Sequence, residues 1–461
     1  MNEPGSIDAA TGLRRGLRSR HLQLIALGGV IGAGLFVGSG VVVQSAGPAA
    51  VLSFALTGTI VGLVMRMLGE MAVAYPAVGG FYEYNRLAHG ELAGFLTGWM
   101  YWYFWVIVVA LEAVAGAKLI DYWIPGFPPW IFTLALTAIF TIVNLMSVRA
   151  WGETEFWFAS IKVAAIVVFL LAGSAWVLGF WPGGGGDLSN LTAHGGFAPN
   201  GIAPILTGAV AATGFYFGAE LVTVAAAESD EPERAVARSM QSVISRVLLF
   251  YVGSIFLVVC ILPWNDPARM AQPYVSALET LGLPGAAHLM NAVILTAVLS
   301  ALNSGLFASS RMLMALARRG DAPRAFAGVD ARGVPVAALL AGTVFAYVTV
   351  IMSYVSPDRV FAFLVNSYGT VAIFVYVLIA AAQLRLRRRL ETEAPERLRL
   401  KMWGYPYLSW FAIVAMVALV VAMAFIPDQR APLLFGVLST GVMLAGFVLR
   451  QRGSDARDTR S

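Results

Sequence analysis

The sequence has few charged residues, few histidines and almost no cysteine. Of the 461 residues, 12% are charged, about half the share that is usual for a soluble domain, so we expect no soluble domain. The single cysteine, Cys260, lies in an apolar stretch and can form no intrachain disulfide, which argues against redox chemistry. The four histidines lie far apart in the chain: His21, His89, His194 and His288.

Catalytic and metal-binding patterns are also missing from the sequence. There is no metal-ligand spacing, no phosphate-binding loop and no cluster of histidine, serine and aspartate residues at one depth. We therefore expect no metal, no cofactor and no enzymatic activity.

Apolar residues make up 59% of the chain and fall into long windows. A helix needs about 20 apolar residues to cross a bilayer, and twelve windows of this kind can be found. They are 22–43, 48–68, 93–119, 130–147, 155–179, 203–225, 241–263, 284–317, 334–354, 358–382, 405–426 and 432–450. The sequence predicts an all-α polytopic membrane protein with twelve transmembrane helices, in contact with membrane lipid. It predicts no oligomeric state.

The basic residues indicate how the chain is oriented. Residues 1–21 are polar and basic and do not have the form of a signal peptide. With this end inside the cell, most arginines fall on the cytoplasmic side, as the positive-inside rule requires. The net charge of +5 therefore follows membrane topology, and we expect no nucleic-acid partner. The expected segments are a tail 1–21, a transport core 22–382, a basic loop 383–404, two helices in 405–450 and a tail 451–461.

A glycine-rich stretch, Leu27–Gly40, lies inside the first window. Each interior glycine costs a helix about 1 kcal/mol relative to alanine, so a break is expected here. Backbone N–H groups freed by a break carry positive partial charge, which suits a carboxylate. The alternative is close helix packing through Gly28 and Gly32. The predicted substrate-binding residues of this stretch are Val30, Ile31, Gly32, Ala33 and Gly34.

A second stretch, Gly208–Glu220, combines glycines and aromatics inside the sixth window. It comes five windows after the first break, and this odd offset reverses orientation. The windows therefore divide into inverted repeats, about 22–179 and 203–382, with a broken helix leading each, as in a transporter. An amino acid zwitterion suits such a pair of breaks. The predicted residues here are Thr213, Gly214, Phe215 and Tyr216, of which the aromatics either gate the site and attract the ammonium or are core or lipid-facing residues.

Several motifs point to one family. They include Gly29-Val30-Ile31-Gly32-Ala33-Gly34-Leu35-Phe36, Gly69-Glu70-Met71-Ala72 and Phe217-Gly218-Ala219-Glu220. With these motifs the chain resembles, over all twelve windows, the amino acid permeases of the amino acid–polyamine–organocation superfamily. The third window, with Trp102-Tyr103-Phe104-Trp105-Val106 and Ala110-Leu111-Glu112-Ala113, looks most like the γ-aminobutyrate (GABA) permeases.

The resemblance implies a fold and a function. The fold is LeuT-like, with a five-plus-five inverted repeat, broken helices 1 and 6, and two added helices. The function is proton-coupled import of an amino acid across the plasma (inner) membrane by alternating access. GABA or a related neutral amino acid is the expected substrate. The alternatives are sodium coupling, exchange instead of symport, or an aromatic, small neutral or cationic substrate.

Three of the charged residues inside apolar windows are candidates for function, because a charge there costs about 3 kcal/mol on insertion scales. The resemblance implies that Lys162 takes the place of a bound sodium ion and takes part in proton coupling; the alternatives are a snorkelling lysine or a permanent bond to backbone carbonyls. Glu220 is either a proton carrier or a residue that fixes the hinge. Glu112 either meets the substrate ammonium, pairs with Lys118 or Lys162, or makes an internal polar bond.

Overall fold

The structure is a computed structural model, and all regular secondary structure in its described part is helical. That part consists of residues 24, 29–75, 80–182, 185–225, 248–283, 285–355 and 357–458, and it contains no strand. The predicted tail 1–21, Gly28 and residues 226–247 lie outside the described residues.

The helices follow the apolar windows. The labelled α-helices are α2 (Ser39–Ala46), α3 (Ala50–Ala74), α4 (Phe81–His89), α5 (Glu91–Asp121), α6 (Pro129–Met146), α7 (Val148–Val177), α8 (Ala203–Tyr216), α9 (Leu221–Ala225), α11 (Ser254–Ile261), α12 (Pro267–Ala271), α13 (Pro273–Thr280), α14 (Ala286–Arg318), α15 (Val336–Val355), α16 (Pro357–Glu393), α17 (Tyr407–Phe425) and α18 (Arg430–Asp458). Two π-helical turns, η1 (Gly34–Gly38) and η5 (Leu249–Gly253), precede α2 and α11.

Nine helical segments in the described ranges are long and apolar enough to cross a membrane. They are Gly34–Ala74, Glu91–Asp121, Pro129–Met146, Trp151–Val177, Ala203–Val224, Ala286–Arg318, Gly369–Glu393, Tyr407–Phe425 and Arg430–Arg452. The first of them covers two predicted windows, and two shorter apolar helices, Leu249–Ile261 and Val336–Met352, match two more. An all-helical polytopic membrane protein is therefore confirmed, while the exact number of twelve spans stays a prediction.

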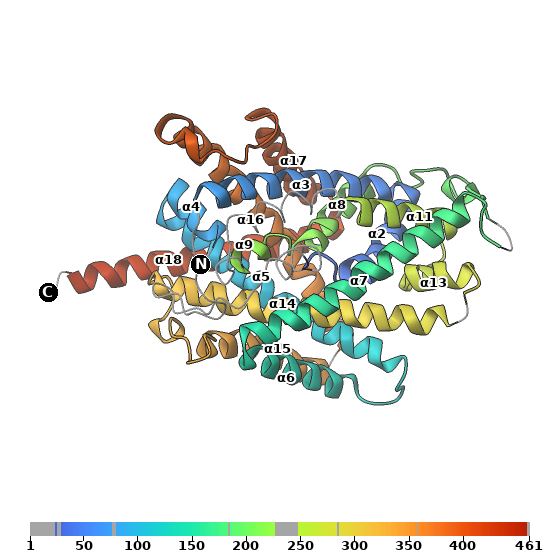
Figure 1. The fold of residues 1–461 in the computed structure, drawn as a ribbon, viewed down its shortest axis with the longest axis horizontal. Coiled ribbons are helices and arrows are strands. Elements are labelled where there is room, and N and C mark those ends of the chain that lie inside the picture. The colour runs from blue at the N-terminus through green and yellow to red at the C-terminus, as the bar shows by residue number, and fades with distance from the viewer. Residues whose placement is uncertain are drawn as a thin grey trace.

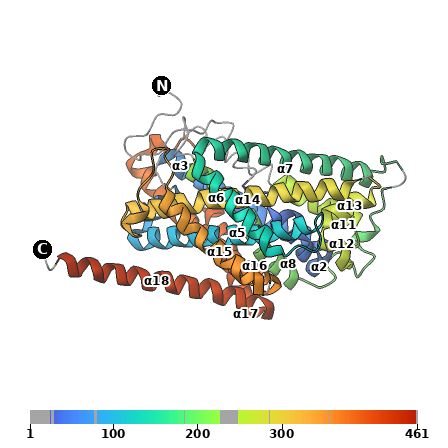
Figure 2. The ribbon, with the colours of Figure 1, turned by 90° about the horizontal axis from the view of Figure 1, so that it is seen from below.

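Two long helices form the centre of the bundle. α14 runs the length of the molecule and packs against α5, α7 and α15 (Figures 1 and 2). α5 and α14 are buried on most sides, and the Trp151 ring of α7 stacks on Phe307 of α14 with 3.7 Å between centroids. α18 instead runs along the outside of the bundle, with side chains such as Val442 and Leu449 exposed. α17 and α18 therefore form an apolar outer edge of the bundle, and apolar side chains on such a surface are stable in lipid.

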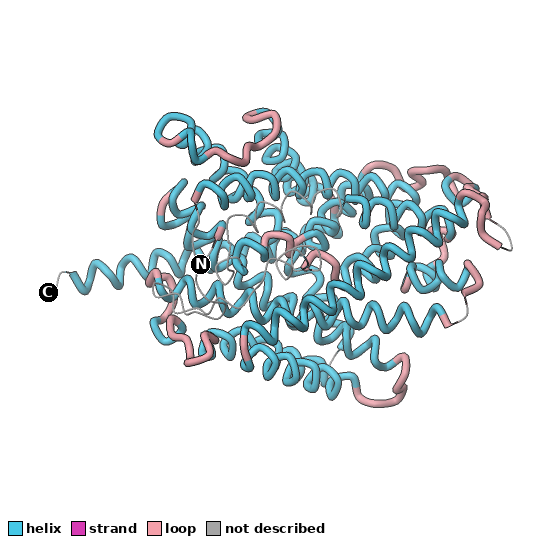
Figure 3. The backbone as a smooth tube through the Cα atoms, viewed as in Figure 1, coloured by secondary structure: helices cyan, strands magenta, loops and turns pink. Residues whose placement is uncertain are grey.

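Figure 3 shows the C-terminal end of α18 projecting from one end of the bundle. A charged cluster joins α4, α18 and the segment after α14. Asp321, which follows α14 and is fully buried, accepts a hydrogen bond from Tyr82 and pairs with Arg86, both on α4. Arg450 of α18 also reaches Asp321, at 2.5 Å. Burial and the hydrogen bond to Asp321 raise the pKa of the Tyr82 phenol well above its usual range, so this hydroxyl stays a donor. A second ion pair joins Glu70 of α3 to Arg387 of α16 at 2.6 Å.

Candidate functional site

Within the described part of the first glycine-rich stretch, the chain is not helical from Gly29 to Gly32. Residues 29–32 form turns and bends, and helical structure begins with η1 and continues into α2. The first N–H groups of a helix have no partner within that helix. Of the predicted residues, Ala33 is the N-cap of η1 and Gly34 is its first residue, so the Gly34 amide is one of these first N–H groups.

A second interruption separates α8 from α9. α8 ends at Tyr216, Phe217 is extended, and Gly218 has a φ of +130°. A Cβ on Gly218 would lie only 2.3 Å from the carbonyl oxygen of Gly29, so no other residue fits between the two backbones. The two interrupted segments thus touch each other directly.

Side chains from two other helices hold the interruptions in place. The hydroxyl of Tyr251, in η5, lies 2.8 Å from the carbonyl oxygens of both Val30 and Phe215. The buried carboxylate of Glu220 accepts hydrogen bonds from the Gly218 amide at 3.0 Å and from the Tyr376 hydroxyl of α16 at 3.2 Å. These bonds satisfy backbone groups that would otherwise be unpaired inside the membrane.

The ring of Phe215 rests on the glycines of η1. A Cβ on Gly34 would lie 2.7 Å from Phe215 Cγ, and one on Gly38 would lie 2.6 Å from its Cζ. Carbon atoms in contact are normally about 3.5–4.0 Å apart. The glycines of this stretch therefore make room for the aromatic ring of Phe215 from the other segment. They have a close-packing role in addition to the predicted helix-breaking role.

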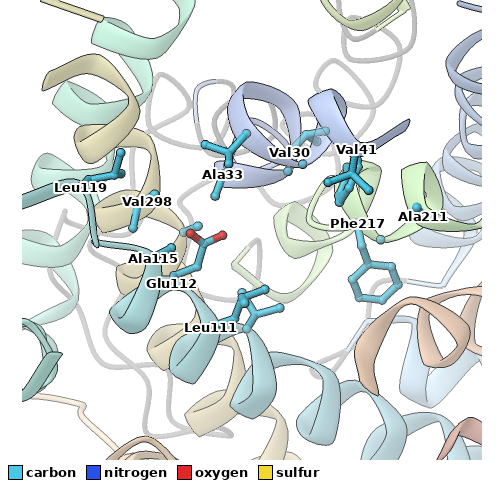
Figure 4. Close-up of a pocket in the computed structure, with 18 of the residues that line it drawn as sticks. Val30, Ala33, Val41, Leu111, Glu112, Ala115, Leu119, Ala211, Phe217 and Val298 are labelled. Atoms are coloured by element: carbon cyan, nitrogen blue, oxygen red, sulfur yellow. The ribbon is translucent and has the colours of Figure 1, made fainter. Parts of the chain in front are cut away.

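A cavity of about 370 Å³ lies beside the interruptions (Figure 4). This is within the range of about 300–1,000 Å³ that is usual for small-molecule sites. Its wall is mostly apolar, with Val108 and Leu111 of α5, Val298 of α14 and the ring of Phe217. Among the described lining residues only Glu112 and Lys118 are charged.

Glu112 forms the polar part of the cavity wall on α5. Its side chain is almost fully buried, and Figure 4 shows the carboxylate directed toward the segment that carries Ala33. The Ala33 backbone hydrogen-bonds to this carboxylate, and Oε1 would lie 3.3 Å from a Cβ on Gly32. A carboxylate thus already binds at the first interruption.

The structure brings most of the predicted substrate-binding residues to the cavity. Seven of the ten line it: Val30, Gly32, Ala33, Gly34, Glu112, Gly214 and Phe215. The other three do not line it. Ile31 is fully buried, Thr213 donates to the Ala209 carbonyl at 2.9 Å, and Tyr216 donates to the Phe54 carbonyl at 3.0 Å. Lys162 and Glu220 are not part of the wall either.

Lys162 lies in a buried polar cluster beyond the cavity. Its Nζ donates to Ser300 Oγ of α14 at 2.7 Å and lies 3.9 Å from Glu155 Oε1 of α7. Ser300 in turn donates to Glu155. All three side chains are fully buried.

Sequence reasoning missed Glu155 and Tyr251. Glu155 stands at the first position of its predicted window, where a carboxylate is ordinary, but it lies seven residues before Lys162 and therefore on the same face of one helix. That spacing was the available signal. Tyr251 had no comparable signal, because its two carbonyl partners come from segments 221 and 36 residues away.

A helical bundle whose interrupted segments meet at a cavity is the architecture of a membrane transporter. The chain matches the family model for amino acid permeases over residues 21–449, and it belongs to this family. It is therefore a multi-pass plasma-membrane transporter of amino acids and not an enzyme, and the resemblance to the amino acid–polyamine–organocation superfamily is confirmed.

Named relatives match along almost the whole chain. The γ-aminobutyric acid permease of Bacillus subtilis is 48% identical over 96% of this chain and 95% of its own. The γ-aminobutyric acid permease of Escherichia coli K12 is 44% identical over 94% and 92%. An aromatic amino acid transport protein of Corynebacterium glutamicum is 40% identical over 89% and 90%.

Proposed function

We propose that this protein is a proton-coupled symporter that imports GABA or a closely related neutral amino acid by alternating access. The observation that carries the proposal is the buried carboxylate of Glu112, which lies beside a non-helical backbone segment at the wall of a mostly apolar cavity. The identities of 48% and 44% to two GABA permeases support the choice of substrate.

The proposed architecture is a LeuT-like five-plus-five inverted repeat. The repeats are about 22–179 and 203–382, helices 1 and 6 are broken, and the two helices of 405–450 are added to this core. The non-helical residues 29–32 and 217–220 support it, because they fall in windows five apart. We place the tails 1–21 and 451–461 and the loop 383–404 in the cytoplasm, on the basis of the positive-inside rule.

The proposed substrate site uses both interruptions. The substrate carboxylate binds the amides of Gly32, Ala33 and Gly34; the bond between Ala33 and Glu112 supports this, because it shows a carboxylate at the same backbone. When the substrate carboxylate takes over this amide, Glu112 turns to the substrate ammonium. Phe215, packed on Gly34, then covers the substrate.

An amine at the far end of a three-methylene chain suits this arrangement. The apolar wall accommodates the methylenes, and a carboxylate in a dry cavity makes a stronger charge-assisted bond than one in water. The aromatic transport protein at 40% identity favours an aromatic amino acid as the second candidate, since the same apolar wall suits a ring.

Proton coupling is assigned to Lys162 and Glu220. Lys162 replaces a sodium ion beside the first interruption, and its full burial with hydrogen-bonding partners supports a role that requires a charge inside the membrane. Glu220 is fully buried between the second interruption and α16, where gain or loss of a proton changes the bonds that hold Gly218.

The test is uptake into proteoliposomes with labelled GABA and a panel of other amino acids, with and without an inward proton gradient and without sodium. Proton-dependent accumulation of GABA is the expected result. Uptake that needs sodium would contradict the coupling, and proton-driven uptake of an aromatic amino acid instead would replace the substrate. Lys162→Ala with unchanged proton dependence would contradict the role of that residue.

A further inference from the structure

We propose that Glu155 is a second proton-binding site, which accepts the proton from Lys162 through Ser300 and releases it toward the start of α7. This proposal rests on the proposed proton coupling through Lys162. It adds a proton acceptor on a different side chain, outside the substrate cavity.

The hydrogen bonds among the three residues have one possible direction. An ammonium has no acceptor, so Lys162 donates to Ser300 Oγ, at 2.7 Å. An ionised carboxylate has no donor, so the hydroxyl proton of Ser300 points to Glu155 Oε1. The chain of bonds therefore runs from the lysine to the carboxylate.

One transfer along this chain is balanced. The Nζ–H bond of Lys162 breaks and a new O–H bond forms on Ser300, while the original O–H proton of Ser300 moves to Glu155 Oε1. The products are a neutral amine, an unchanged serine and a neutral carboxylic acid. Because the ion pair separated by 3.9 Å is neutralised, no net charge is created in the membrane interior.

Glu155 is the charged residue of the cluster that lies nearer the start of α7. Lys162 lies fourteen residues from the first residue of α7 and Glu155 only seven, or about 21 Å and about 10 Å along the axis at 1.5 Å per residue. Glu155 Oε2 is buried and makes no hydrogen bond within the described part of the chain. Buried polar atoms of this kind are normally paired with protein or water, so a water molecule can bind at this oxygen. Rotation of the neutral carboxyl group by a half-turn then brings the protonated oxygen to that water, which takes the proton.

Further polar groups lie one helical turn nearer the start of α7 than Glu155 does. Trp151 donates to the Asn303 carbonyl at 3.3 Å, and the Asn303 side chain accepts from Asn144 of α6 at 2.9 Å. Asn303 lies three residues after Ser300, on the same face of α14. The remaining polar atoms of both asparagines are buried without a partner among the described residues, as is Ser304 Oγ. They provide binding positions for the water that carries the proton away.

Among the described residues, the charged groups that act on this pair are Glu155 and Lys162 themselves and Glu112. Lys162 itself lies on the same helix as Glu155, and Glu112 of α5 acts electrostatically on Lys162 from the other side. Glu112 faces the substrate cavity and Glu155 does not. Lys162 therefore lies between Glu112, which is proposed to bind the substrate ammonium, and Glu155, which lies outside the substrate cavity.

The experiment compares net uptake with exchange in proteoliposomes for Glu155→Gln. Glutamine keeps an oxygen that accepts from Ser300 but binds no proton at neutral pH. Proton-driven net uptake should fall at least about tenfold, since a positioned proton acceptor typically contributes about 100-fold or more. Exchange of labelled for unlabelled substrate, which needs no proton release, should stay within about twofold of the wild type by the same reasoning.

The control is Glu279→Gln, the same chemical change at an exposed position on α13. It should leave both rates unchanged. Glu155→Asp, which restores a titratable group, should recover part of the net uptake. Ser300→Ala, which removes the relay but neither charge, should slow net uptake more than exchange.

The outcomes separate the two proposals. If the wild type shows no proton dependence, the proposed coupling fails and this inference fails with it. If the wild type is proton-coupled and Glu155→Gln retains full proton-driven uptake, only the Glu155 site is overturned. If Glu155→Gln loses exchange and net uptake equally, and Ser300→Ala does the same, the cluster is structural and the inference is wrong.

Discussion

The contact between Gly34 and Phe215 gives the most direct test of the interrupted segments. Gly34→Ala adds one methyl group, which would lie 2.7 Å from Phe215 Cγ and 2.9 Å from its Cβ. The ring must move by roughly 1 Å to restore contacts of about 3.5–4.0 Å. Overpacking of this kind costs about 1–3 kcal/mol.

The cost falls on the conformation in which the two segments meet. Because the substrate is proposed to bind between them, the apparent affinity decreases by the same free energy. At 1.4 kcal/mol for each factor of ten, the Kd should rise about 5- to 140-fold. The assay is equilibrium binding of labelled substrate to the purified protein.

Two further variants make this prediction specific. Gly441→Ala is the matched control, because a Cβ there meets nothing within 4 Å and the helix geometry is ordinary. Phe215→Gly removes both the ring and the Cβ, so adding Gly34→Ala to it should cost almost nothing. A full double-mutant cycle should therefore show coupling of about 1–3 kcal/mol. Additive effects, or an unchanged Kd in Gly34→Ala, would refute the reasoning.

Three more predictions concern the hydrogen bonds and ion pairs. Glu112→Gln should raise the KM for GABA about 10- to 150-fold, the equivalent of the 1.5–3 kcal/mol of a hydrogen bond to a charged group; equal KM values in uptake assays would remove Glu112 from the site. Tyr251→Phe leaves two buried carbonyls without their donor, at a cost of about 1–3 kcal/mol. It should therefore lower the melting temperature and slow transport. A variant with wild-type values in both would show that this hydroxyl does not hold the interruptions. Asp321→Asn leaves Arg86 without its buried partner, at a cost of about 3–5 kcal/mol. Its melting curve should shift down more than that of Asp187→Asn, an exposed control.

The sequence predicted the elements well because their signals are local. Hydropathy alone located the apolar helices, since crossing a bilayer requires a long apolar stretch whatever its neighbours are. Glycine clusters located residues 29–32 and 217–220, because interior glycines weaken a helix regardless of the surrounding fold.

The sequence predicted less about which way side chains face. α5 and α14 are buried on most sides and therefore carry no clear polar stripe. Thr213 and Tyr216 were predicted to bind substrate with Phe215, but their hydroxyls bond to neighbouring carbonyls away from the cavity. A helix that turns about 100° per residue cannot direct four consecutive side chains into one cavity.

Composition and local pattern thus determined the membrane class, the positions of the apolar helices and the family. Tertiary structure alone decided which distant groups meet. Ser300 lies 138 residues from Lys162 and 145 from Glu155, yet one hydroxyl joins them. The physical reason is that burial in lipid forces each polar group to find a partner, but the partner is whichever group the packing of helices brings within about 3 Å.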